Sequence, residues 1–169
     1  MAGKLPALPG EKPNMKDWED HLTTLFPEVR MKKFLEMRGA DGGPWASLCA
    51  MPALWVGLLY NQGAQEAAWD LVKNFTVEEM ARIRAEVPRL GLATPLDQGG
   101  TLLDIAKPAL EIAMDGLRGR ARPGAVTADE TEYLGSLHET VAAGRTPAEV
   151  LLERYNDAWG KSVDPIYTE

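Results

Sequence analysis

The pattern of apolar and charged positions has a period of two between residues 30 and 38. Met31, Leu35 and Met37 alternate there with charged residues. This pattern is typical of a strand with one face on a core and the other on solvent or a ligand. We therefore predict one strand over about residues 30–38. Its polar face carries the even-numbered residues Arg30, Lys32, Phe34, Glu36 and Arg38.

Most of the remaining chain shows helical spacing, with an N-cap predicted at Asn14 and capping boxes predicted to start at Thr76, Thr127 and Thr146. About seven helical segments are expected, over residues 14–24, 44–60, 65–74, 76–87, 101–117, 127–142 and 146–158. The second of these is apolar almost all round and is expected to be a buried helix, bent or restarted at Pro52. Pro88 is expected to end the fourth, and Pro108 to kink the fifth or to mark its true start. Glycine and proline make residues 1–13 a loop, and residues 90–100 and 160–169 are expected to be irregular.

These elements predict a mostly helical α+β fold in which residues 1–169 form a single domain. Residues 1–13 are its leading loop, residues 14–45 a helix, strand and loop with the candidate site, and residues 46–160 a helical region. A lone strand cannot satisfy its backbone hydrogen bonds. Its partner is either a second strand in the weakly patterned N-terminal part or a segment of the protein that lies outside this chain.

Charge and hydropathy exclude several classes of partner. The chain carries 25 acidic and 18 basic residues, for a net charge of −7, so a general attraction for nucleic acid is not expected. The longest apolar run, residues 51–59, is too short to span a bilayer. The N-terminus also lacks the apolar segment of a secretory signal. We therefore predict a cytoplasmic location, with no membrane partner.

The polar face of the predicted strand carries the residue types that phosphoryl transfer requires. Glu36 and Arg38 share this face, with Cα atoms about 7 Å apart from a rise of roughly 3.3 Å per residue. This spacing allows Glu36 to ligate Mg²⁺ while Arg38 reaches phosphate oxygens that the cation also touches. The alternative is a solvated strand face with paired charges, which is common. The pattern alone leaves both open.

Other reactive side chains give weaker signals. The only cysteine, Cys49, lies in an apolar setting that suits a small buried side chain. His21 and His138 are far apart in sequence and have no partner at a metal-binding spacing. Surface or capping roles are expected for both histidines.

Three blocks of sequence resemble the glutamate–cysteine ligases of plants and many proteobacteria. They are HLTTLFPEVR followed by FLEMRGADGGPW (residues 21–45), LCAMPALWVGLLY (residues 48–60), and residues 146–165. The resemblance implies a fold related to glutamine synthetase, and an ATP-dependent reaction that joins glutamate to cysteine through γ-glutamyl phosphate in glutathione biosynthesis. It also implies that Glu36 binds a Mg²⁺ of the ATP site and that Arg38 stabilises the transferred phosphoryl group.

The same resemblance implies that this chain is the C-terminal part of a longer enzyme. Most metal ligands, nucleotide contacts and glutamate contacts would then lie in the N-terminal part, which becomes a necessary partner, and the chain alone is expected to be inactive. Cys49 resembles one half of a redox-responsive disulfide of the family. A homodimer is also a possible state of the enzyme. Two alternatives remain: a helical interaction domain without catalysis, and a related carboxylate–amine ligase with another amine acceptor.

Overall fold

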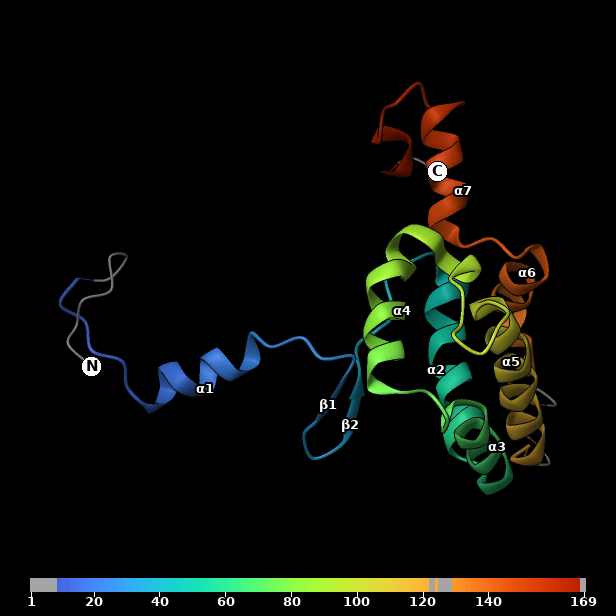
Figure 1. Cartoon of the computed structure of the whole chain (residues 1–169), viewed down its shortest axis with the longest axis horizontal. Helices are drawn as coiled ribbons and strands as arrows, with labels where there is room; N and C mark the ends of the chain where they lie inside the picture. Colours follow the sequence, from blue (N-terminus) through green and yellow to red (C-terminus); the bar gives the residue numbers. More distant parts are fainter. Residues whose placement is uncertain (1–8, 122–123, 125–128, 168–169) are drawn as a thin grey trace. The chain divides into compact units, whose positions relative to one another are not determined.

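The computed structural model describes residues 9–121, 124 and 129–167 (Figure 1). Contacts between Cα atoms divide the chain into two compact units, Met1–Asp41 and Gly42–Glu169. The first unit contains the candidate site, and the second contains the hydrophobic core. The boundary between them falls just after the predicted strand.

The first unit contains one helix and one β-hairpin. Helix α1 (Met15–Thr23) begins at Asn14, whose side chain accepts hydrogen bonds from backbone N–H groups of the first turn, so the predicted N-cap is confirmed. Strands β1 (Val29–Met31) and β2 (Leu35–Met37) pair antiparallel. The predicted single strand over residues 30–38 is therefore wrong, because residues 32–34 form a bend that turns the chain back on itself.

The bend nevertheless keeps the predicted faces. Arg30 lies opposite Glu36 in the hairpin register, and directly opposed residues of an antiparallel pair point to the same side. Arg38 follows Glu36 by two positions, just after β2, and its backbone N–H donates to Glu28 O at 2.7 Å, which continues the pairing. The charged residues thus share one face of a hairpin instead of one face of a strand.

Burial in this unit is the reverse of the prediction. Met31 is 82% exposed and Leu35 is 59% exposed, although the pattern placed both on a core. Arg30 and Glu36 are instead half-buried. Within residues 9–41 no side chain is buried, so this hairpin has no core of its own.

The second unit is helical, in agreement with a mostly helical α+β fold. Its helices are α2 (Trp45–Leu59), α3 (Gln62–Val72), α4 (Val77–Leu90), α5 (Leu102–Gly119), α6 (Gly135–Ala143) and α7 (Pro147–Asn156). Three short 3₁₀ turns are η1 (Gly91–Ala93), η2 (Thr131–Leu134) and η3 (Asp164–Tyr167). The described residues of the whole chain therefore contain seven α-helices, the number that was predicted.

The prolines inside the helices do not interrupt them. Pro52 and Pro108 lie inside the continuous helices α2 and α5. The prediction that Pro88 ends its helix is wrong, because α4 continues to Leu90 and ends at Gly91, which has a positive φ of 53°. Proline removes one backbone hydrogen bond of a helix. Pro88 lies in the last turn of α4, where only two more helical residues follow it.

The predicted capping boxes are only partly confirmed by the observed helix starts. The box at Thr146 and Glu149 is confirmed at the start of α7. The box predicted to start at residue 127 falls partly outside the described residues. The chain then enters the 3₁₀ turn η2 at Thr131 before α6 begins at Gly135.

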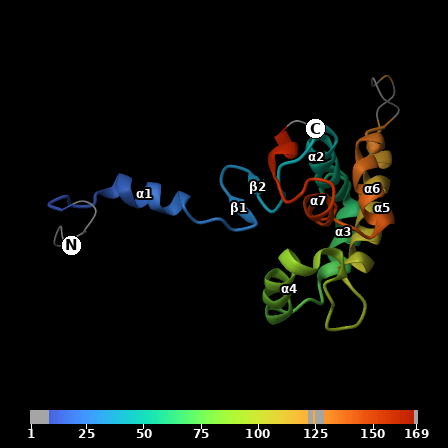
Figure 2. The same cartoon turned by 90° about the horizontal axis from the view of Figure 1, so that it is seen from above.

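The core lies where α2 and α5 cross, covered by η2 and α6 (Figures 1 and 2). Its buried members are Ala53, Leu110, Ala113, Leu117 and Leu134. Helix α2 contributes only small buried residues, at positions 50, 53 and 57, so it is not buried all round as its apolar sequence suggested. This stripe of small residues allows the two helix backbones to approach closely.

We predict that a methyl group at the crossing destabilises the protein. A Cβ at Gly57 would collide with the carbonyl oxygen of Ala113, and a Cβ at Gly116 would collide with the carbonyl oxygen of Gly57. Gly57→Ala and Gly116→Ala should each lower the free energy of unfolding by about 1–3 kcal/mol or more. Gly135→Ala is the control, because a Cβ there has nothing within 4 Å. Equal melting temperatures for all three variants would contradict this packing.

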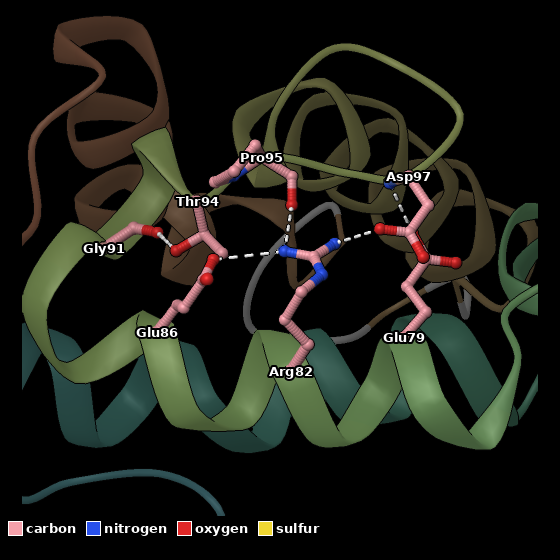
Figure 3. A network of polar contacts seen from close by, with 7 residues as sticks. All are labelled: Glu79, Arg82, Glu86, Gly91, Thr94, Pro95 and Asp97. Atoms are coloured by element: carbon pink, nitrogen blue, oxygen red, sulfur yellow. Dashed lines mark hydrogen bonds and ion pairs between the residues drawn. The ribbon is translucent and has the colours of Figure 1, made fainter.

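A polar network ties α4 to the segment that leads into α5 (Figure 3). Arg82 Nη1 donates to Glu86 Oε2 and to the Pro95 carbonyl oxygen, both at 3.1 Å. Arg82 Nη2 donates to Asp97 Oδ1 at 2.7 Å. Asp97 N in turn donates to Glu79 Oε1 at 2.8 Å. Glu79 was predicted to complete a capping box with Thr76, but its carboxylate binds this distant segment instead.

We predict that Glu79→Ala lowers the free energy of unfolding by about 1–3 kcal/mol, because it leaves the Asp97 N–H without its acceptor. Glu78→Ala is a matched control: Glu78 is exposed and also lies in the first turn of α4. The control should change stability by about 0.5 kcal/mol or less. Chemical denaturation measures the difference, and equal losses would contradict a specific role for Glu79.

Candidate functional site

The hairpin brings the two predicted site residues together with a third residue, Arg30. Arg30 Nε donates to Glu36 Oε2 at 2.7 Å, and Arg30 Nη2 lies 2.7 Å from the same oxygen. Arg38 Nη1 lies 3.7 Å from that oxygen, which is an ion-pair distance and too long for a hydrogen bond. One carboxylate therefore lies between two guanidinium groups on one face of the hairpin.

The Arg38 guanidinium is held by a stacking contact. Its Cζ lies 4.3 Å above the centre of the Phe26 ring, within the range of a cation–π interaction. Nη1 is buried and has no hydrogen-bond acceptor among the described residues. A buried donor without an acceptor is uncommon in folded proteins. This nitrogen thus lacks an acceptor that a substrate or another segment of the protein could supply.

The electrostatics of the hairpin keep Glu36 ionised. The hydrogen bond from Arg30 is the largest cause that lowers the pKa of Glu36 below its usual value. Partial burial opposes this effect and raises the pKa, whereas the positive charges of Arg30, Lys32 and Arg38 lower it further. The net result is a carboxylate in a locally positive environment, although the chain as a whole has a charge of −7.

The described residues do not form a metal site by themselves. No group of three or more His, Cys, Asp or Glu side chains in the described part of the chain is placed to hold a metal ion. Glu36 still fits the role of a single ligand, since Mg²⁺ is commonly bound by one or two carboxylates together with phosphate oxygens and water. Arg30 and Arg38 contact Oε2 of Glu36, so Oε1 is the oxygen that a cation would bind.

Sequence reasoning missed the roles of Arg30 and Phe26. Arg30 was assigned to the polar face but not to the site, because its contact with Glu36 requires the bend at residues 32–34. That bend has no glycine, proline or asparagine to mark it. Phe34 and Asp41, also on or beside the predicted polar face, are exposed in the bend and in the loop after β2.

The other candidate residues lie away from this cluster in the sequence and carry no comparable arrangement. Cys49 is a half-buried free thiol that lines a cavity of about 420 Å³ between α2, the end of α5 and η2. Its predicted redox role stays a prediction. His138 contacts the Met114 sulfur, and His21 lies beside Trp18 on α1. Among the described helices, none is both long and apolar enough to cross a membrane.

Comparison with known proteins gives the relationships of the chain. The family model described as glutamate-cysteine ligase family 2 (GCS2) matches residues 4–169. Over 169 residues the chain is 52% identical to the chloroplastic glutamate–cysteine ligase of Arabidopsis thaliana and 50% identical to that of Solanum lycopersicum. Each match covers 100% of this chain and 31% of the relative. Glutamate–cysteine ligase A of Oryza sativa subsp. japonica is 46% identical, with 33% of its length covered.

These relatives correct the predicted location. Their names describe them as chloroplastic, which points to the plastid and makes the prediction of a cytoplasmic location wrong. The absence of an apolar secretory segment does not indicate the cytoplasm, because plastid transit peptides are amphipathic and carry no such segment. The chain also spans only about a third of the length of the curated relatives it matches.

The resemblance seen in the hairpin and in α2 therefore extends over the chain. The family model covers residues 4–169 and about half of all positions are identical in the plant enzymes. The chain belongs to glutamate-cysteine ligase family 2.

Proposed function

We propose that this chain supplies part of the Mg·ATP site of a glutamate–cysteine ligase that forms γ-glutamylcysteine through γ-glutamyl phosphate. The observation that carries the proposal is the position of Glu36 between Arg30 and Arg38 on one face of the hairpin. An ionised carboxylate can ligate the cation, while the guanidinium groups give the face a net positive charge. Phosphoryl transfer depends on this combination of charges.

In this proposal each residue has a distinct task. A bound Mg²⁺ would neutralise charge on the phosphate oxygens of ATP. Glu36 would hold the cation, because Arg30 and Arg38 contact only its Oε2 atom among the described interactions. Arg38, stacked on Phe26, presents its guanidinium to the oxygens of the transferred phosphoryl group. The buried Nη1 without an acceptor supports this assignment, because a bound phosphoryl group would supply acceptor oxygens.

The remaining parts of the site would come from the rest of the enzyme. One carboxylate and two arginines do not make pockets for glutamate, cysteine and the nucleotide. The share of the relatives that the chain covers, about a third, leaves most of the length for those pockets. The proposed partners of the chain are therefore the remainder of the same enzyme and the three small-molecule substrates. A homodimer is compatible with this arrangement.

Two alternatives make different predictions about the same hairpin. A helical interaction domain without catalysis would dock its strand segment onto the sheet of a partner, and the charges of Glu36 and Arg38 would not matter for turnover. A related ligase would use the same Mg·ATP chemistry with another amine acceptor. Glu36 has no role in turnover in the interaction domain, whereas it keeps its role in the related ligase.

We predict that Glu36→Gln in the complete ligase lowers kcat by about 100-fold or more, since even residues that only support metal ligands cost 10–100-fold. Arg38→Lys keeps the charge but loses the planar guanidinium, and should lower kcat by about 10²–10³-fold. ATP-dependent phosphate release in the presence of glutamate and cysteine measures both effects.

The control for this experiment is Glu19→Gln, which makes the same chemical change at an exposed position of α1. It should retain normal turnover. Normal turnover of Glu36→Gln would remove the Mg·ATP assignment and favour the interaction domain. Replacing cysteine with other amines in the same assay tests the remaining alternative.

We also predict that the chain of residues 1–169 has no ligase activity by itself, because its described residues form no group of three or more metal-binding side chains around a cation. The measurement is phosphate release from ATP by the purified chain, with both amino acids and Mg²⁺ present. Turnover that requires both glutamate and cysteine would contradict the incomplete site.

A further inference from the structure

We propose that Arg30 is a positioning residue for Glu36: it fixes one carboxylate oxygen so that the other faces the cation. This inference rests on the function proposed above, and extends it to a residue with no assigned role. It is drawn from the geometry of the hairpin.

The contact between Arg30 and Glu36 involves only one of the two carboxylate oxygens. Arg30 Nε and Nη2 are both 2.7 Å from Glu36 Oε2. A guanidinium fork commonly binds the two oxygens of a carboxylate in parallel. Here both nitrogens hold one oxygen, so Oε1 remains for a metal ion while the carboxylate cannot rotate freely. Carboxylates that ligate metals are in general oriented by such outer hydrogen bonds.

The contact between Arg30 and Glu36 also limits how closely Arg38 approaches Glu36. Arg38 Nη1 lies only 3.7 Å from Glu36 Oε2, and Oε2 already accepts from Arg30. Without Arg30, a small movement would bring Arg38 into a direct hydrogen bond with Glu36. The metal ligand and the phosphoryl-binding arginine would then neutralise each other. Arg30 thus prevents a direct hydrogen bond between Glu36 and Arg38, although the two side chains remain neighbours.

A purely stabilising role explains the arrangement less well. The side chains of Arg30 and Glu36 are 21% and 33% exposed. Ion pairs contribute little to stability at the surface, and when they are desolvated the cost of removing water can offset their attraction. The hairpin has no buried side chain of its own. A tight two-nitrogen contact to one oxygen at this position therefore has its clearest explanation in orienting Glu36.

The test uses the complete ligase with Mn²⁺ in place of Mg²⁺ and a non-hydrolysable ATP analogue. Free Mn²⁺, measured by electron paramagnetic resonance, gives the Kd of the bound ion without any turnover. Arg30→Lys keeps the charge and should raise this Kd about 10-fold, within the 10–100-fold range for outer-sphere partners. Arg30→Met should raise it at least as much. In turnover assays, the Mg²⁺ requirement should increase while the KM for cysteine stays unchanged.

Lys33→Met is the control, because it removes a cation from the bend next to Arg30 without a contact to Glu36. Its Kd for Mn²⁺ should stay within about twofold of the unchanged enzyme. Melting temperatures identify any variant that fails to fold, and Arg30→Lys retains a cross-strand cation if Arg30→Met does fail. An unchanged or tighter Kd in folded Arg30→Lys would overturn the positioning role.

Glu36→Gln in the same binding assay separates the two proposals. If Glu36→Gln weakens Mn²⁺ binding but Arg30→Lys does not, the Mg·ATP assignment stands and the role of Arg30 is wrong. If Glu36→Gln also binds Mn²⁺ normally, the proposed function itself is wrong, and the inference falls with it.

Discussion

The position of Glu36 depends on the length of the bend between β1 and β2. The three residues of this bend place Arg30 opposite Glu36. A bend longer or shorter by one residue would shift the register by one and turn the opposing side chain to the other face. Arg30 would then no longer reach the carboxylate. The proposed chemistry of the chain thus depends on a local backbone feature that fixes which charges meet.

The same hairpin places its apolar side chains in an unusual environment. Met31 and Leu35 are exposed, whereas the charged face is half-buried. An isolated two-stranded hairpin is marginally stable in water, and needs further strands or a helix on its apolar face. This agrees with the proposal that the hairpin belongs to a larger active site, since the chain covers about a third of its relatives. The helical unit, in contrast, has a core around α2 and α5.

The sequence predicted much of this structure wherever a local interaction determines it. Caps at Asn14 and Thr146 marked two helix starts correctly, because capping depends on residues within one turn. Periodicity predicted that Glu36 and Arg38 share a face. Periodicity could not predict that the apolar face with Met31 and Leu35 is exposed. Alternation separates two faces of a strand but does not show which of them is covered. The contact from Arg30 was missed for a related reason: its bend carries none of the usual turn residues.

The central claim is that the Glu36 carboxylate binds the cation of the ATP site while Arg30 holds its other oxygen. The most direct measurement is a crystal structure of the complete ligase with Mn²⁺ and a non-hydrolysable ATP analogue, using anomalous scattering to locate the metal. The account predicts a metal ion within about 2.0–2.3 Å of Glu36 Oε1, with both Arg30 contacts to Oε2 retained. A metal ion bound only by other carboxylates, with Glu36 still paired and distant from it, would contradict the account.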